Sequence, residues 1–196
     1  LLMLMPPTSE PYRCNLDNVD WANSILVLGC SHTWGFGLEP EETYCYQLEK
    51  LLKKPVINLG MPGTGIDYTV NNLLRLNVSV LQPFKVIVQY SDSSRFFYWH
   101  DFDKITNYTP ETVPSDIGRY LMSKPHSQQT AQFYRQIIHA LCPDVVEFTF
   151  TIDDSIELNI PQAPVDDRCD RAKDSTHFGP LTNIEIAKWL SRLIHN

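Results

Sequence analysis

Short apolar runs alternate with amphipathic segments over the first ninety residues. The runs at 25–28, 55–59 and 85–89 are too short for helices and are followed by glycine or polar residues. Such runs are typical of strands that are buried on both faces. Between them, segments 44–52 and 66–76 repeat apolar residues at helical spacing. This alternation predicts a parallel sheet with helices on both faces.

The second half of the chain continues the pattern around an aromatic insertion. Helices are predicted at about 127–141 and 181–194, and a strand at 145–151. Residues 156–160 could add a further short strand. The segment at about 90–125 is rich in aromatic residues, and we expect it to be an ordered insertion with short helices. Insertions of this length are often lids or binding walls. The predicted fold is therefore a three-layer α/β/α sandwich with a mostly parallel sheet of four to five strands.

Length and composition favour one globular domain. The chain has 196 residues and a formal net charge of −7. We expect an N-terminal arm at 1–24 and one domain at 25–196. An acidic chain without basic runs gains little from a phosphate backbone, so no nucleic-acid partner is expected. No apolar run approaches the roughly 18 residues that a membrane span needs. Five cysteines without CxxC spacing indicate reduced thiols, which favours a cytoplasmic protein.

A serine follows the first predicted strand. Ser31 lies two residues after the glycine that ends this run. In open α/β sheets, ligands bind at the carboxyl ends of the strands. Backbone N–H groups at the start of a following helix could stabilise an oxyanion there. Ser31 is therefore a candidate nucleophile, and the alternative is an ordinary turn serine.

A candidate acid and base precede the last predicted helix. Asp174 and His177 are three residues apart in one loop, so the carboxylate can lie beside the imidazole and orient it. The alternative is a turn aspartate followed by a surface histidine. His32 is adjacent to Ser31, but neighbouring side chains in an extended loop usually diverge. His177 is therefore the preferred base.

These two segments resemble conserved blocks of the SGNH (GDSL-like) hydrolases. The segment Gly29-Cys30-Ser31-His32-Thr33-Trp34-Gly35 resembles the family's first block, in which the strand ends in Gly-Asp-Ser. The segment Asp174-Ser175-Thr176-His177 resembles its last block. The resemblance implies a flavodoxin-like SGNH fold, a nucleophilic Ser31, a general base at His177 and an orienting acid at Asp174. It departs from the family at Cys30, where an aspartate is usual.

The middle blocks match less well. Asn58-Leu59-Gly60-Met61-Pro62-Gly63 resembles the second block, and the resemblance implies that Gly63 and Ser31 donate backbone N–H groups to an oxyanion. The third block of the family is Gly-x-Asn-Asp, and here it reads Gln89-Tyr90-Ser91-Asp92. In the family, the asparagine of this block donates its side-chain N–H to the oxyanion, and Ser91 stands at that position here. Its hydroxyl can donate a hydrogen bond, although it is shorter than an amide, so Ser91 is the expected third donor.

Two further residues are candidates for contacting the substrate. Arg95 could assist Ser91 or bind substrate, and the alternative is a surface ion pair. Trp99 belongs to an aromatic stretch that could form a carbohydrate or acyl wall, although aromatic residues also simply fill cores.

The function expected from this resemblance is hydrolysis of a small-molecule or glycan ester by a serine hydrolase, with neither cofactor nor metal. Two alternatives remain open. The first is a non-catalytic module that binds a glycan or a protein on the same fold. The second is transfer of an acyl group to a sugar hydroxyl.

Overall fold

A four-stranded parallel sheet forms the centre of the molecule. The computed structural model describes residues 13–92, 95–101, 104–108, 116–121, 123–151, 158–166 and 168–195. The strands, in chain order, are β1 (Ile25–Leu28), β2 (Val56–Asn58), β3 (Lys85–Tyr90) and β6 (Val146–Thr149). Their spatial order is β2-β1-β3-β6, and every neighbouring pair is parallel. All four carboxyl ends therefore lie at one edge of the sheet.

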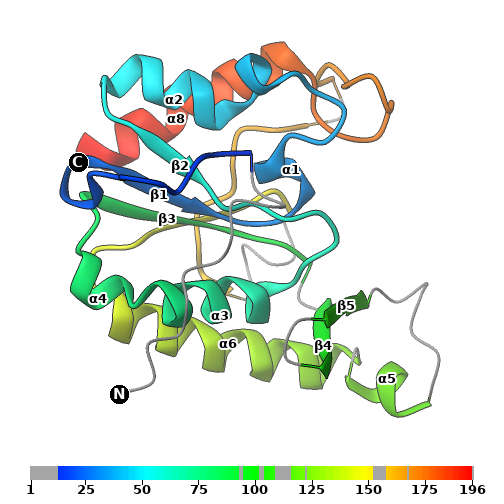
Figure 1. Cartoon of the computed structure of the whole chain (residues 1–196). Coiled ribbons are helices and arrows are strands. Elements are labelled where there is room, and N and C mark those ends of the chain that lie inside the picture. Colours follow the sequence, from blue (N-terminus) through cyan, green and yellow to red (C-terminus); the bar gives the residue numbers. More distant parts are fainter. Residues whose placement is uncertain are drawn as a thin grey trace.

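Helices cover both faces of this sheet (Figure 1). One layer consists of α2 (Tyr44–Leu52) and α8 (Pro180–His195), and the other of α3 (Ile66–Leu76), α4 (Val78–Leu81) and α6 (Lys124–Leu141). The predicted three-layer α/β/α fold is confirmed. Within the described residues the sheet has four strands, and Gln162 adds only an isolated parallel bridge to Thr149. Of the strand considered at 156–160, residues 158–160 are described, and they do not form a strand.

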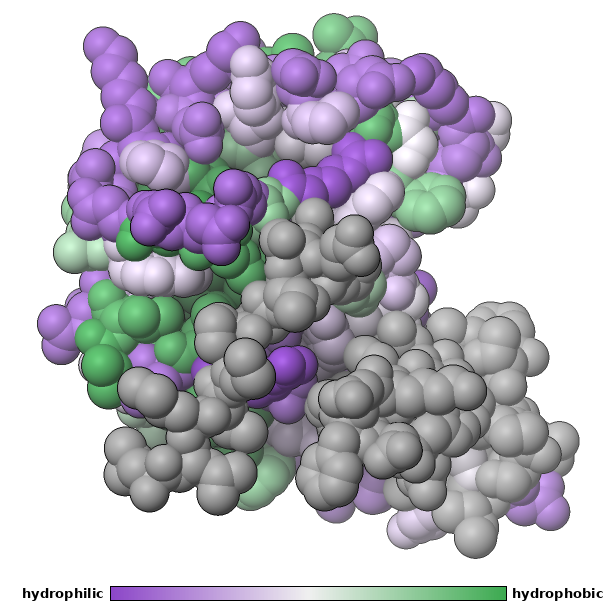
Figure 2. Space-filling model, viewed as in Figure 1, coloured by the Kyte–Doolittle hydropathy of each residue, from purple (hydrophilic) through white to green (hydrophobic). Residues whose placement is uncertain are grey.

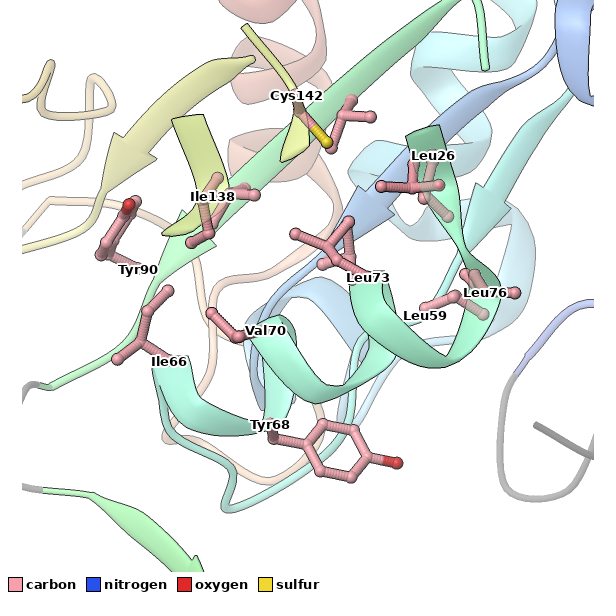
Figure 3. Close-up of a cluster of buried hydrophobic side chains, with 14 of the residues drawn as sticks. Leu26, Leu59, Ile66, Tyr68, Val70, Leu73, Leu76, Tyr90, Ile138 and Cys142 are labelled. Carbon is pink, nitrogen blue, oxygen red and sulfur yellow. The ribbon is translucent and has the colours of Figure 1, made fainter. Parts of the chain in front are cut away.

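The two layers bury separate apolar clusters because side chains alternate along each strand. In β1, Leu26 and Leu28 face the α3 and α6 layer, whereas Ile25 and Val27 face the α2 and α8 layer. All four are fully buried, which explains the continuous apolar run. Figure 3 shows the first of these clusters, in which α3 and α6 contribute side chains beside those of the strands.

The helix boundaries follow the sequence pattern closely. Helix α2 begins after Thr43, whose side chain accepts the Tyr46 N–H at 3.3 Å as an N-cap. Both α2 and α3 have the predicted bounds, whereas α6 begins at Lys124, three residues before its predicted start. Pro125 occupies its first turn, where a proline costs no hydrogen bond.

The aromatic insertion contains a hairpin in addition to a helix. Strands β4 (Phe96–Asp101) and β5 (Lys104–Tyr108) pair antiparallel, and α5 (Asp116–Leu121) follows them. The expectation of short helices was therefore wrong for the first part of the insertion. Aromatic and β-branched residues favour strands, and this preference explains the hairpin. The suggested role as a lid remains a prediction.

The described part of the N-terminal arm packs on the domain. Cys14, Leu16, Val19 and Trp21 are partly buried against the cluster under α3. Leu1–Met5 lie outside the described residues. The five cysteines, which all fall within the described part of the chain, form no disulfide.

Hydrophilic residues dominate the surface above the sheet in the view of Figure 2, whereas apolar residues gather over α4. Val80 in α4 and Phe84 after it are both exposed. None of the helices in the described residues is long and apolar enough to cross a bilayer.

Candidate active site

Ser31 lies at the carboxyl edge of the sheet, at the start of a single helical turn. This turn, α1 (Ser31–Trp34), begins three residues after the last residue of β1. Figure 1 shows α1 next to the loop that precedes α8, although these segments are about 140 residues apart in sequence. Ser31 is 8% exposed, so it is largely buried.

Ser31, His177 and Asp174 form a continuous hydrogen-bonded chain. The Ser31 Oγ lies 2.8 Å from His177 Nε2, and His177 Nδ1 lies 2.5 Å from Asp174 Oδ2. An ionised carboxylate can only accept, so Nδ1 carries the imidazole proton. Nε2 of the neutral ring then has a free lone pair and accepts the Ser31 hydroxyl. The structure thus brings together the three residues that the sequence predicted.

Asp174 is held in its ionised form. Partial burial opposes ionisation, but hydrogen bonds from the His177 ring and from the N–H groups of His177 and Thr176 outweigh it. Together they lower the pKa of Asp174 to about 2. The carboxylate therefore remains an acceptor at any pH at which the protein would work.

A small antiparallel turn presents Asp174 and His177. Arg171 and Phe178 form a bridge, and the Ala172 N–H donates to the His177 carbonyl at 2.9 Å. Asp170 anchors this turn to the first turn of α8 by accepting three hydrogen bonds, from the Leu181 N–H, the Thr182 N–H and the Thr182 hydroxyl. Asp170 carries no local signal for this role in the sequence, because the helix that it caps begins ten residues later.

Gly37 lets the segment after α1 approach this turn closely. Its φ is +77°, and a Cβ there would lie 3.2 Å from the Asp174 carboxyl carbon and 3.1 Å from the Ala172 Cβ. The Gly37 carbonyl also accepts the Lys173 N–H at 3.3 Å. Any other residue would be strained and would press on Asp174.

Two backbone N–H groups at this edge of the sheet have no acceptor among the described residues. The loop after β2 lies against the end of β1, since the Met61 N–H donates to the Gly29 carbonyl at 2.9 Å. Gly63 in this loop has a φ of +77°. Among the described residues, neither the Ser31 N–H nor the Gly63 N–H has an acceptor. These are the two backbone donors that the resemblance implied.

Ser91 lies beside the same loop, but its hydroxyl is already engaged. Its Oγ donates to the Thr64 carbonyl at 3.0 Å. To serve as a donor to an oxyanion, the hydroxyl would first have to leave Thr64. The present contact instead ties the end of β3 to the loop that carries Gly63.

His32 packs on the imidazole of His177 rather than on Ser31. Its ring centroid lies 4.7 Å from that of His177, and the rings of Phe150 and Phe178 lie on other sides at 5.0 and 4.8 Å. Among the described residues, His32 has no hydrogen bond to Ser31. Burial, together with the charges of His177 and Arg95, lowers the pKa of His32 to about 3. His32 is therefore a neutral packing partner of His177, a role that the sequence did not reveal.

The remaining predicted residues lie near the hairpin. The backbone carbonyl of Arg95 contacts Gly65, where a Cβ would lie 2.3 Å from the carbonyl oxygen. The guanidinium is close enough to influence the pKa of His32. Trp99 belongs to β4, but its side chain lies outside the part of the chain described here. Phe36 is an additional candidate that sequence analysis missed, since it is 43% exposed and its ring lies 5.4 Å from that of His177.

Sequence comparisons give no relative for this chain. No family model matches it, and no curated protein matches it.

Solved structures of esterases share the fold. A protein described as a lipolytic member of the G-D-S-L family, from Desulfitobacterium hafniense DCB-2, aligns with a TM-score of 0.55 and 12% identity over 87% of this chain and 99% of that chain. An acetyl xylan esterase from Butyrivibrio proteoclasticus aligns with a TM-score of 0.59 and 12% identity, over 90% of this chain and 64% of that one. The psychrotrophic esterase EstA from Pseudoalteromonas sp. aligns with a TM-score of 0.54 and 14% identity, over 89% of this chain and all of that one. The chain therefore has the fold of SGNH hydrolases.

Proposed function

We propose that this protein is a serine hydrolase that cleaves an ester through an acyl-enzyme intermediate. The observation that carries the proposal is the chain from Ser31 Oγ through the His177 ring to Asp174, with contacts of 2.8 and 2.5 Å. A nucleophile in contact with a base, and a base oriented by a third group, is the arrangement that activates a serine. The esterases that share the fold support the reaction class only in general terms.

In the proposed reaction, Ser31 attacks the ester carbonyl and His177 takes its proton through Nε2. His177 then returns the proton to the leaving alcohol, and the ester bond breaks to leave an acyl group on Ser31. A water molecule, activated by the same imidazole, releases the acid. Asp174 stays ionised throughout and stabilises the imidazolium.

The N–H groups of Ser31 and Gly63 hold the oxyanion in this proposal. Neither N–H group donates to an acceptor among the described residues, so no existing hydrogen bond has to break before they bind the oxyanion. Ser91 contributes to the oxyanion hole by fixing the Gly63 loop through Thr64. A direct hydrogen bond from Ser91 would require this contact to break.

The substrate is proposed to be a small-molecule or glycan ester. Arg95 directly precedes β4 and Trp99 belongs to this strand, and both remain the proposed contacts for the part of the substrate beyond the reacting carbonyl. Phe36 supplies an exposed aromatic surface beside His177.

Turnover of 4-nitrophenyl acetate by the purified protein tests the proposal. We expect release of nitrophenol that is lost in both Ser31→Ala and His177→Ala. Ser191→Ala and His195→Ala are matched controls, because both residues are on α8 away from Ser31, and they should retain the activity. Equal rates in the wild type and Ser31→Ala would overturn the proposal.

Product analysis separates the alternatives. A hydrolase yields free acetate in the presence of an added alcohol, whereas an acyltransferase yields the new ester. A folded wild type without any turnover of 4-nitrophenyl or glycan acetates would favour a binding module on the same fold.

A further inference from the structure

A buried glutamine reaches from β3 into the turn that carries Ser31. Gln89 is 2% exposed, and its Oε1 accepts hydrogen bonds from the Cys30 N–H at 3.0 Å and from the Thr33 hydroxyl at 3.1 Å. Its Nε2 donates to the Tyr90 carbonyl. The two groups held by Oε1 belong to residues on either side of Ser31. One amide oxygen therefore closes the turn around the nucleophile.

The surroundings are shaped for this contact. A Cβ at Gly29 would lie 2.2 Å from Thr33 Oγ1 and 2.6 Å from Gln89 Oε1, so only glycine leaves room for the pair. Tyr44, which is fully buried, donates its hydroxyl to Thr33 Oγ1 at 2.8 Å. Burial raises the pKa of Tyr44, which keeps this hydroxyl protonated. Thr33 must therefore direct its own hydrogen to Gln89.

We propose that Gln89 is a positioning residue for Ser31, because its side chain holds the residues on either side of the nucleophile. The inference rests on the proposed hydrolase function. Cys30 and Gln89 are two of the positions at which this chain departs from the Gly-Asp-Ser and Gly-x-Asn-Asp patterns. These two departures are in contact, since the Cys30 N–H donates to the Gln89 side chain. The Gln89 amide oxygen supplies the acceptor for this turn from the neighbouring strand β3.

This contact should affect the reaction by fixing the orientation of Ser31. The turn held by Gln89 sets where the Ser31 N–H points and where Ser31 Oγ lies relative to His177 Nε2. A shift of about 1 Å in such a group can reduce a rate by about 100-fold. Loss of the Gln89 acceptor should therefore reduce the rate of acylation and leave substrate binding nearly unchanged.

The test compares Gln89→Leu and Gln89→Glu with the wild type. Leucine keeps a side chain of similar size but accepts nothing. A buried, protonated glutamic acid can accept from Cys30 and Thr33 and donate to Tyr90, as glutamine does. We expect about a 100-fold lower kcat for 4-nitrophenyl acetate in Gln89→Leu at a KM changed less than threefold, and kcat restored to within about tenfold of the wild type in Gln89→Glu.

Ser24→Ala is the matched control for loss of a buried hydrogen bond. Ser24 is fully buried at the opposite end of β1, and its hydroxyl donates to the Asp20 carbonyl at 2.6 Å. This variant should lose stability without losing kcat. Tyr44→Phe is a second, milder variant in case Gln89→Leu does not fold. It leaves Thr33 without its donor and should lower kcat several-fold.

Amide hydrogen exchange at Cys30 separates this inference from the proposed function. The Cys30 amide should exchange faster in Gln89→Leu than in the wild type and Ser24→Ala. Wild-type kcat in a folded Gln89→Leu, or a loss that Gln89→Glu does not recover, would overturn the inference. A wild type without turnover would overturn the proposed function, and with it any catalytic role of Gln89, even if the exchange result shows that the hydrogen bond exists.

Discussion

Two polar clusters among the described residues at the sheet differ in whether all of their hydrogen-bonding groups have partners. The first, the Glu147 cluster, comprises Tyr90, Arg135, His139 and Glu147. The Glu147 carboxylate accepts from Tyr90 at 2.6 Å and from the Arg135 guanidinium at 2.8 to 3.0 Å, and it lies 3.0 Å from His139 Nε2. Both carboxylate oxygens are engaged.

The second, the Ser31 cluster, comprises Ser31, Gly63, Asp174 and His177. Its side chains are linked in one chain, but two backbone N–H groups have no acceptor among the described residues. The Glu147 carboxylate is thus fully engaged within the fold, whereas the N–H groups of Ser31 and Gly63 are the groups that hold the oxyanion in the proposed function.

Replacement of the orienting acid should produce the largest change. Asp174→Asn keeps the size of the side chain but can present its NH₂ group to His177 Nδ1, which favours the wrong tautomer. We expect kcat to fall by about 10⁴-fold, as for the same change in other serine triads. Asp166→Asn, at an exposed residue paired with Arg168, is the control and should retain activity. A loss of less than tenfold in Asp174→Asn would contradict the assigned role.

Removal of the charge from the Glu147 cluster should affect stability and not chemistry. Glu147→Gln leaves the Arg135 guanidinium without its carboxylate partner, and we expect unfolding to become easier by about 1–3 kcal/mol. Urea denaturation measures the change. The rate per folded molecule should equal that of the wild type, and a specific loss of kcat would remove the distinction between the two clusters.

His32 should make the stability depend on pH below neutrality. Its pKa of about 3 in the folded protein is below the ordinary value of 6.5, so between these values the unfolded chain binds a proton that the native state does not. Stability should therefore fall as the pH falls from 6.5, by at most about 1.4 kcal/mol per pH unit from this group. His32→Phe should lack this contribution in urea unfolding at pH 7, 6 and 5. An unchanged slope would show that His32 is not buried as a neutral ring.

Ser91 should have the smallest effect. Because its hydroxyl holds Thr64, Ser91→Ala should reduce kcat by less than about tenfold, compared with the 10²–10³-fold that follows removal of a direct oxyanion donor in other hydrolases. Steady-state kinetics distinguish these outcomes. A loss of 100-fold or more would show that Ser91 donates directly.

The spacing of apolar residues along the chain was sufficient to predict most strands and helices of the three layers. The apolar runs predicted β1 and β3, and helical spacing predicted α2 and α3 with the observed bounds. It failed in the insertion, where Phe96–Asp101 and Lys104–Tyr108 form a hairpin. The aromatic residues of this segment follow no regular period of two, so the pattern of apolar positions does not predict its strands.

The site was predictable only in part, because much of it depends on contacts between distant residues. The resemblance implied Ser31, Asp174 and His177, and the structure places them in contact. It did not imply Gln89, which is 59 residues from Cys30, or Asp170, which caps α8 from outside the helix. Neither residue type carries a local signal for such a role, and only the folded chain brings each one to its partners.

The most direct test of the central claim is labelling of the folded protein with a fluorophosphonate probe, followed by mass spectrometry of the intact chain and its peptides. The account predicts one adduct per chain on Ser31, which is absent from Ser31→Ala and at least strongly reduced in His177→Ala. A folded wild type that remains unlabelled, or an adduct that persists in Ser31→Ala, would contradict it.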